Sequence, residues 1–172
     1  MTKTGTLLTA GALLLLAEAW LRRSNPYRLW PSAFDEASVA EPHPTRGWTQ
    51  RRNLDFVFYH RYLRKPNRVH FNNLGMRDSR DYSIAKPPGT LRVQLFGCTT
   101  AAGWELPADL TISSQLEALL RRHLNQPVEV MNASARIYCT AQLYHWYVEE
   151  LAAFEPDVVV YYFNTNHPRR NI

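Results

Sequence analysis

The sequence lacks the residue spacing of a metal site and has few of the residues that build one. Cysteine occurs only twice, at Cys98 and Cys139, and no two of the six histidines show the spacing of a zinc or iron site. We therefore predict no bound metal and no other cofactor. Four histidines are interpreted as ordinary structural or surface residues: His60, His70, His123 and His145.

Internal repeats, low-complexity tracts and nucleic-acid recognition motifs are also absent. Without such a motif, a net charge of +5 does not by itself indicate nucleic acid, and we predict none as a partner. The charge is concentrated, because residues 22–81 carry twelve basic and six acidic side chains. Since this stretch directly follows an apolar N-terminal segment, we expect it to face phospholipid head groups or an acidic partner protein.

Residues 1–23 are predicted to form a transmembrane anchor, and the remaining length leaves room for one modest domain. The segment 4–21 is mostly apolar and would span about 27 Å as a helix, close to the hydrocarbon thickness of a bilayer. Trp20 falls where an aromatic belt residue would lie. Arg22 and Arg23 follow it and can reach lipid head groups.

The fate and the orientation of this segment each have an alternative. Ala17 and Ala19 flank Glu18 as in a signal-peptide cleavage site, although we expect the segment to be retained. The basic residues that follow the segment outnumber Lys3, and the positive-inside rule would then put the body in the cytoplasm. A large domain can be translocated despite such charges, so the residues alone leave both sides of the membrane open.

Residues 24–90 are predicted to form a proline-rich extended arm. They hold seven of the eleven prolines, which excludes long helices. Residues 54–59 and 68–71 are rich in residues that favour strands, and Lys65-Pro66-Asn67 is expected to form the turn between them. The arm should therefore contain one short hairpin.

Residues 91–172 alternate predicted strands with predicted helices, which is typical of an α/β fold with a parallel sheet. The strands are expected at 91–96, 128–131 and 158–163, with one helix after an N-cap at Thr111 and another over 140–154. The first helix has a predicted apolar face made of Leu116, Leu119, Leu120 and Leu124. We predict a three-stranded parallel sheet with flanking helices.

Two motifs make the sequence similar to a known family. Asn72-Asn73-Leu74-Gly75-Met76-Arg77-Asp78 precedes a basic and apolar strand, Leu91 to Phe96, and Gly97 then begins a loop of small residues. In this order of elements the sequence resembles the SGNH (GDSL-type) hydrolases, especially bacterial members with an N-terminal membrane helix. The resemblance runs from about Gly47 to Asn171, and it implies a body outside the cytoplasm, on the periplasmic side of the inner membrane.

The resemblance also implies that the catalytic residues are degenerate. Where the family has Gly-Asp-Ser, this sequence has Gly97-Cys98-Thr99, so a β-branched threonine stands at the nucleophile position. Ser134 stands where the family has the oxyanion-hole glycine. The third family block, Gly-x-Asn-Asp, matches here only at Asn166, which His167 follows.

Further expectations concern the end of the sequence and the two cysteines. The sequence reaches Ile172 before the family's Asp-x-x-His block, which supplies the general base, and it covers three of the family's five strands. We therefore expect an open sheet edge where Val158, Val160 and Tyr162 contact a partner. The family's loops bring Cys98 and Cys139 near each other, and either a disulfide or two buried free thiols would fit.

These expectations favour a catalytically silent SGNH-like subunit. It would stabilise a larger bacterial membrane protein complex, with other subunits and the lipid bilayer as its partners. Two alternatives stay open. One is a membrane-anchored esterase or acyltransferase that acts on envelope glycans or lipids, and the other is a lipid- or glycan-binding module.

Overall fold

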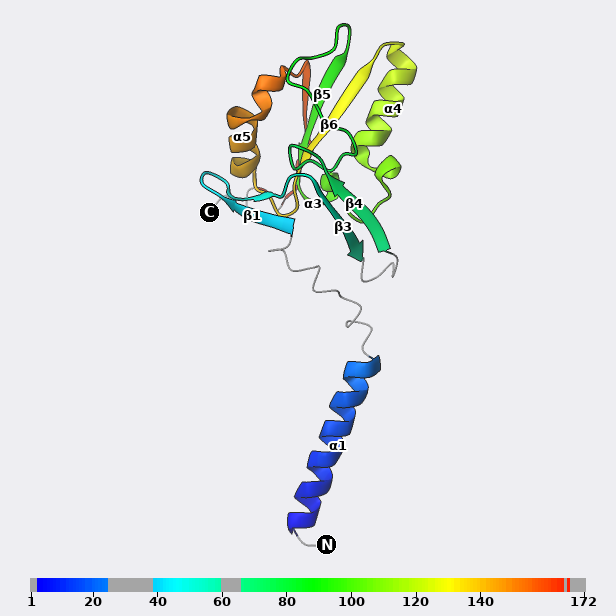
Figure 1. Cartoon of the computed structure of the whole chain (residues 1–172), viewed down its shortest axis with the longest axis vertical. Helices are drawn as coiled ribbons and strands as arrows, with labels where there is room; N and C mark the ends of the chain where they lie inside the picture. The colour runs from blue at the N-terminus through cyan, green and yellow to red at the C-terminus, as the bar shows by residue number, and fades with distance from the viewer. Residues whose placement is uncertain (1–2, 25–38, 60–65, 166, 168–172) are drawn as a thin grey trace.

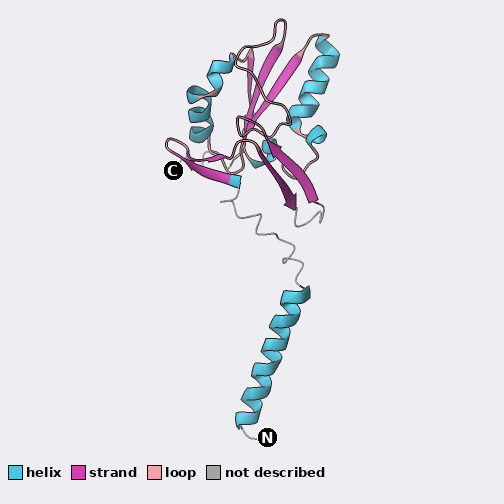
Figure 2. Ribbon diagram, in the orientation of Figure 1, coloured by secondary structure: helices cyan, strands magenta, loops and turns pink. Residues whose placement is uncertain are grey.

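The computed structural model describes residues 3–24, 39–59, 66–165 and 167. The described chain has a mixed α/β architecture with a three-stranded parallel sheet and flanking helices, as predicted (Figure 1). The sheet is made of β5 (Leu91–Gly97), β6 (Val128–Ser134) and β7 (Val158–Tyr161), in the order β6-β5-β7. Helices α4 (Ile112–Leu124) and α5 (Thr140–Glu149) lie on opposite sides of it (Figure 2).

The N-terminal helix α1 covers Lys3–Ser24. Leu13, Leu14, Leu15 and Leu16 are all exposed, and so are Trp20 and Arg23, whereas the side chain of Arg22 lies outside the described part. Among the described residues, no helix combines the length and the apolarity that a membrane crossing requires. The helix itself was predicted correctly, but the prediction that it spans a membrane is not supported.

The two faces of the parallel sheet bury different clusters. Val93, Leu95, Val128 and Val130 face α4 and pack with Ile112, Leu116 and Leu120. The opposite face packs with α5 and with the 3₁₀ helix η4 (Leu151–Phe154) through Phe96, Met131, Leu143, Trp146 and Leu151. A parallel sheet requires such cover on both faces, because its strands are apolar on both.

The two longer helices differ in detail from the sequence prediction. Thr111 caps α4 as predicted, because its side chain accepts a hydrogen bond from the Ser114 N–H. Leu119 and Leu124 are exposed, so the predicted four-leucine face of α4 was wrong at these two positions. The helix predicted over 140–154 ends at Glu149 and continues as η4.

Two hairpins make up the described part of the arm. Strands β3 (Leu54–Tyr59) and β4 (Pro66–Phe71) pair antiparallel, as predicted. The predicted turn at residues 65–67 was wrong, because Pro66 and Asn67 pair with Tyr59 and Phe58. A second hairpin, β1 (Ala40–His43) with β2 (Gly47–Gln50), was not predicted.

Both hairpins pack on the α/β body. The β1–β2 turn binds α5, where the buried Arg46 pairs with Glu150 and its carbonyl accepts a hydrogen bond from Gln142 at 2.8 Å. The β3–β4 hairpin packs on Trp104, which follows helix α3 (Thr99–Ala102). The Arg46 contacts join residues 96 and 104 positions apart, and the Trp104 ring contacts join residues 33 to 48 positions apart, so local sequence patterns could not indicate them.

The motif at residues 72–78 is the joint between the arm and the body. The Asn72 side chain accepts hydrogen bonds from the backbone N–H groups of Leu74 and Met76, both at 3.0 Å, which fixes a tight turn. Gly75 has a φ of +74°, and a Cβ atom there would lie 2.7 Å from the Gln50 carbonyl oxygen. Glycine is therefore required for the close approach of the motif to β2. Met76 is fully buried in the core.

Arg77 extends this joint to the segment at the end of α3. Its guanidinium donates hydrogen bonds to the carbonyl oxygens of Ala102, at 3.4 Å, and Leu106. Burial lowers the pKa of Arg77 to about 10, against a smaller opposing effect of Glu105. The side chain thus fixes the segment that follows α3.

Candidate functional site

The candidate site lies where β5 and β6 end. Gly97 and Ser134 are partners in the parallel register, and α3 begins at Thr99 directly after β5. In open α/β sheets, ligands bind beyond the carboxyl ends of the strands, so this is the expected place for chemistry. The strand-to-helix connection is tight, because a Cβ atom at Gly97 would lie 2.5 Å from the Cβ of Ala101.

Thr99 has no catalytic base in the described part of the chain. Its hydroxyl has one hydrogen-bond partner among the described residues, the Ile137 N–H at 3.4 Å. A threonine hydroxyl is a weak nucleophile unless a neighbouring base removes its proton. No histidine or carboxylate of the described chain is hydrogen-bonded to it.

The hydroxyl of Ser134 is hydrogen-bonded within the sheet. It is fully buried, and its hydroxyl donates a hydrogen bond to the Leu95 carbonyl at 3.1 Å. Asn132, two residues earlier, is also buried and donates to the Ala101 carbonyl at 3.3 Å. Both side chains hold β5, β6 and α3 together, which is a structural role.

His167 packs on Tyr161 at the end of β7 and is not hydrogen-bonded to Thr99. It is fully buried, its Nδ1 lies 2.7 Å from the Tyr161 hydroxyl, and its ring stacks on the Tyr161 ring with centroids 5.3 Å apart. Nδ1 also accepts the Asn164 N–H at 3.3 Å, so this nitrogen carries no proton and the Tyr161 hydroxyl is the donor. The predicted oxyanion-hole residue Asn166 lies outside the described residues.

The two cysteines are not bonded to each other. Cys98 and Cys139 are both buried free thiols, so of the two states considered from the sequence the disulfide was wrong. Within the described ranges no three histidine, cysteine or carboxylate side chains are grouped as metal ligands.

The β7 edge of the sheet is open in the described structure. Val158 and Tyr162 are exposed and Val160 is half-buried against the α4 side. On the other face, Val159 and Tyr161 are exposed beside α5, where they line a shallow apolar groove of about 170 Å³ with Phe96, Leu143, Tyr144 and Tyr147. The sequence prediction named only one face of β7 and missed Val159 and Tyr161.

The Asp157 carboxylate holds the start of β7 in place. The Asp157 carboxylate accepts hydrogen bonds from the Arg92 N–H at 2.7 Å and from the Lys86 ammonium at 2.6 Å. The Arg92 N–H and then Lys86 lower the pKa of Asp157 below its ordinary value. Beyond this point, no side chain of the described chain bonds to the backbone of Val158–Tyr161.

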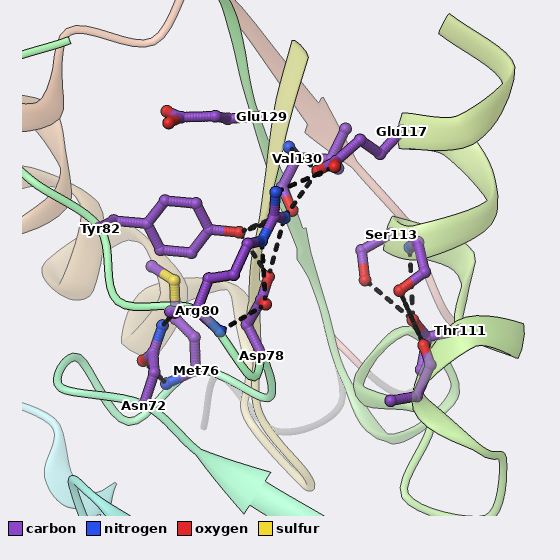
Figure 3. A network of polar contacts seen from close by, with 12 residues as sticks. Asn72, Met76, Asp78, Arg80, Tyr82, Thr111, Ser113, Glu117, Glu129 and Val130 are labelled. Atoms are coloured by element: carbon purple, nitrogen blue, oxygen red, sulfur yellow. Dashed lines mark hydrogen bonds and ion pairs between the residues drawn. The ribbon is translucent and has the colours of Figure 1, made fainter. Parts of the chain in front are cut away.

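The opposite edge, β6, is capped by side chains. Glu117 on α4 accepts the Val130 N–H at 2.9 Å, and Arg121 donates to the Val128 carbonyl at 2.8 Å. The Tyr82 hydroxyl lies 3.3 Å from the Val130 carbonyl, but its single proton is donated to Asp78. Glu117 and Arg121 thus bind backbone groups that a further strand would otherwise pair, and Figure 3 shows Glu117 beside Val130.

A charge network holds these caps in place (Figure 3). Arg80 donates to both Glu117 oxygens, at 2.9 and 2.7 Å, and also contacts Asp78, to which Tyr82 donates a hydrogen bond. Burial acts to lower the pKa of Arg80, but its bonds to Glu117 and Asp78 raise it above the ordinary value. Burial and the nearby Asp78 charge raise the pKa of Tyr82.

Sequence reasoning missed this network, although one signal was present. Glu117 stands directly after Leu116 at the buried side of an amphipathic helix, where an acidic residue needs a charged partner.

The sequence was also compared with known proteins. No family model matches this chain, and no curated protein is significantly similar to it.

Proposed function

We propose that this chain is a non-catalytic accessory subunit of a bacterial membrane protein complex, with an SGNH-like body that binds another subunit along β7. One observation carries the proposal: β6 is capped by Glu117 and Arg121, whereas no described side chain caps β7. Exposed strand edges attract further strands, and proteins that do not use an edge usually block it. The partner is therefore a protein segment that adds to the sheet as a strand beside β7.

The apolar character of β7 supports the same partner. Val158 and Val159 are successive residues and both are exposed, so both faces of the strand offer apolar surface. The adjoining groove between β7 and α5 is lined by aromatic and aliphatic side chains and one threonine, with no charged residue. An added strand can place its alternate side chains in this groove.

The absence of catalysis in this proposal rests on the Thr99 hydroxyl, which accepts the Ile137 N–H and bonds to no base in the described chain. The discriminating assay is the hydrolysis of p-nitrophenyl acetate and butyrate by the full chain. We expect no turnover above buffer, and the same result for Thr99→Ala. Turnover that is abolished in Thr99→Ala would instead establish the esterase alternative.

The membrane part of the proposal rests on α1. Leu13, Leu14, Leu15 and Leu16 are all exposed, and successive helical residues lie about 100° apart, so this turn of α1 offers apolar surface on every side and favours an apolar environment. We propose that this environment is the inner-membrane bilayer, with Trp20 and Arg23 at its surface. A periplasmic position of the body, implied by the SGNH resemblance, belongs to the same proposal and is tested by fusing alkaline phosphatase after residue 172.

The partner is tested by a matched pair of substitutions in the full chain. Val159 on β7 is 49% exposed and Val57 on β3 is 46% exposed, so Val159→Glu and Val57→Glu change the same residue type at the same exposure. Each variant is extracted from native membranes in mild detergent and analysed by blue native electrophoresis. We expect the complex to lose the Val159→Glu chain and to retain the Val57→Glu chain. A complex that retains both chains in equal amounts would overturn the proposal.

A further inference from the structure

A cavity of about 500 Å³ opens near the carboxyl ends of β5 and β6, away from the β7 edge. Its walls come from the β1–β2 hairpin, from Trp104 after α3, and from Arg136 and Ile137 after β6. Pockets that bind small molecules have volumes of about 300 to 1,000 Å³ and are lined mainly by apolar side chains. Val39, Pro42 and Trp48 form the apolar wall on the hairpin side.

The polar groups of the cavity favour an anion. Two arginines, Arg51 and Arg136, line it together with one acidic residue, Glu41. The Arg136 guanidinium lies 4.9 Å from the centre of the Trp104 ring, which holds its planar charge at the wall. Guanidinium groups match carboxylate and phosphate oxygens in geometry and charge.

Trp104 adds an unused hydrogen-bond donor. It is 4% exposed, and no described residue accepts a hydrogen bond from its buried indole N–H. Buried donors of this kind nearly always have an acceptor, because leaving one unpaired costs about 1 to 3 kcal/mol. An oxygen atom of a bound ligand would satisfy it.

Ile137 indicates that the shape of the cavity is held under strain. Its φ is +65°, a left-handed conformation that is rare for a β-branched residue. The bond from its N–H to Thr99 helps to hold this conformation, and its side chain stays partly exposed at the cavity wall. Strained backbone of this kind is concentrated at ligand sites.

We propose that this cavity binds a single acyl chain with a carboxylate or phosphate head. The chain lies against the apolar wall formed by Val39, Pro42 and Trp48, and the head bonds to Arg136 and to the Trp104 N–H. A neutral sugar is disfavoured, because five of the ten lining residues offer no side-chain hydrogen bond to its hydroxyl groups. The inference does not rest on the proposed function, since it uses none of the residues of β7.

The test is photolabelling of the full chain in phosphatidylcholine nanodiscs with decanoate that carries a terminal diazirine. We expect the labelled peptides to include residues 39–51, 104 or 136–137. Unlabelled decanoate and decyl phosphate should compete, decanol should compete roughly tenfold more weakly because it lacks the charge, and inorganic phosphate should not compete. The ligand could be a phospholipid or a free acid, and dihexanoyl phosphatidylglycerol distinguishes the two. If it competes more strongly than decanoate, the site is assigned to a phospholipid. If it competes more weakly, the site is assigned to a free acid.

Three variants keep the proposal falsifiable. Arg136→Gln should reduce labelling roughly tenfold and Arg136→Lys much less, because lysine keeps the charge. Trp104→Phe keeps the ring but removes the N–H, and should reduce labelling several-fold. Equal competition by decanol and decanoate, labelling confined to α1, or wild-type labelling of folded Arg136→Gln would overturn the proposal. Retained thermal unfolding of each variant shows that it is folded.

Discussion

The two edges of the parallel sheet differ in what covers them. Both β6 and β7 begin with valines, and both pair with β5 in parallel. At β6, Glu117 and Arg121 of α4 bind the outer backbone groups, whereas at β7 the described chain provides no such side chain. An edge is therefore closed or open according to side chains from other segments, and the strand's own residues do not decide it.

The largest expected effect comes from opening the closed edge. Glu117→Leu leaves the Val130 N–H without its acceptor and Arg80 with Asp78 as its remaining carboxylate, and we expect it to lower the free energy of unfolding by about 2 to 3 kcal/mol. The estimate is at the lower end for a buried charge, because the Arg80 side chain is partly exposed. Urea unfolding followed by tryptophan fluorescence measures it.

The control for this substitution is Asp109→Asn, at an exposed residue of the 3₁₀ helix η3 (Ala108–Leu110), which should change stability by less than about 0.5 kcal/mol. Equal effects of Glu117→Leu and Asp109→Asn would show that the caps do not stabilise β6.

Substitution of two glycines tests the joint at residues 72–78. Gly75 and Gly89 have nearly the same positive φ, but only at Gly75 would a Cβ atom collide, with the Gln50 carbonyl. We expect Gly75→Ala to cost about 2 kcal/mol or more and Gly89→Ala about 1 kcal/mol. Thermal unfolding of both variants measures the difference, and equal costs would remove the close approach from the explanation.

Charge at the start of β7 should have a smaller effect that depends on pH. Asp157→Asn weakens the bonds to Arg92 and Lys86, and we expect a loss of about 0.5 to 1 kcal/mol at pH 7. Because folding lowers the pKa of Asp157, its stabilising effect is present above the ordinary value of 3.8 and is lost as the pH falls through the lower folded value. Unfolding curves of wild type and variant should therefore differ at pH 7 and converge at a pH below the lowered pKa of the folded state. A difference that persists in acid would contradict this role of the carboxylate.

The smallest expected effect on stability is that of Val159→Glu in the isolated chain. This exposed side chain has few packing contacts to lose, so the free energy of unfolding should change by less than about 0.5 kcal/mol. Urea unfolding of the purified chain measures it. A loss of more than about 2 kcal/mol would mean that β7 is part of the core, and the loss of complex formation could then not be assigned to a binding surface.

The alternation of apolar runs predicted the sheet, its three strands and the flanking helices, because strand and helix periods are local properties. The capped edge could not be predicted, since Arg80 and Glu117 are 37 positions apart and meet only after folding. The same reason explains the missed β1–β2 hairpin, whose Arg46 binds Glu150 at a separation of 104. At the candidate site, the sequence indicated Thr99 and Ser134 but not their occupied hydroxyls, because hydrogen-bond partners follow from the fold.

Amide hydrogen exchange at the two edges tests the central claim most directly. The full chain is measured alone and in the complex extracted from native membranes. The open-edge account predicts that the outward amides of Val158–Tyr161 are protected at least roughly tenfold more strongly in the complex, while the Val130 amide exchanges equally slowly in both. Equal protection of Val158–Tyr161 in the two samples would contradict it.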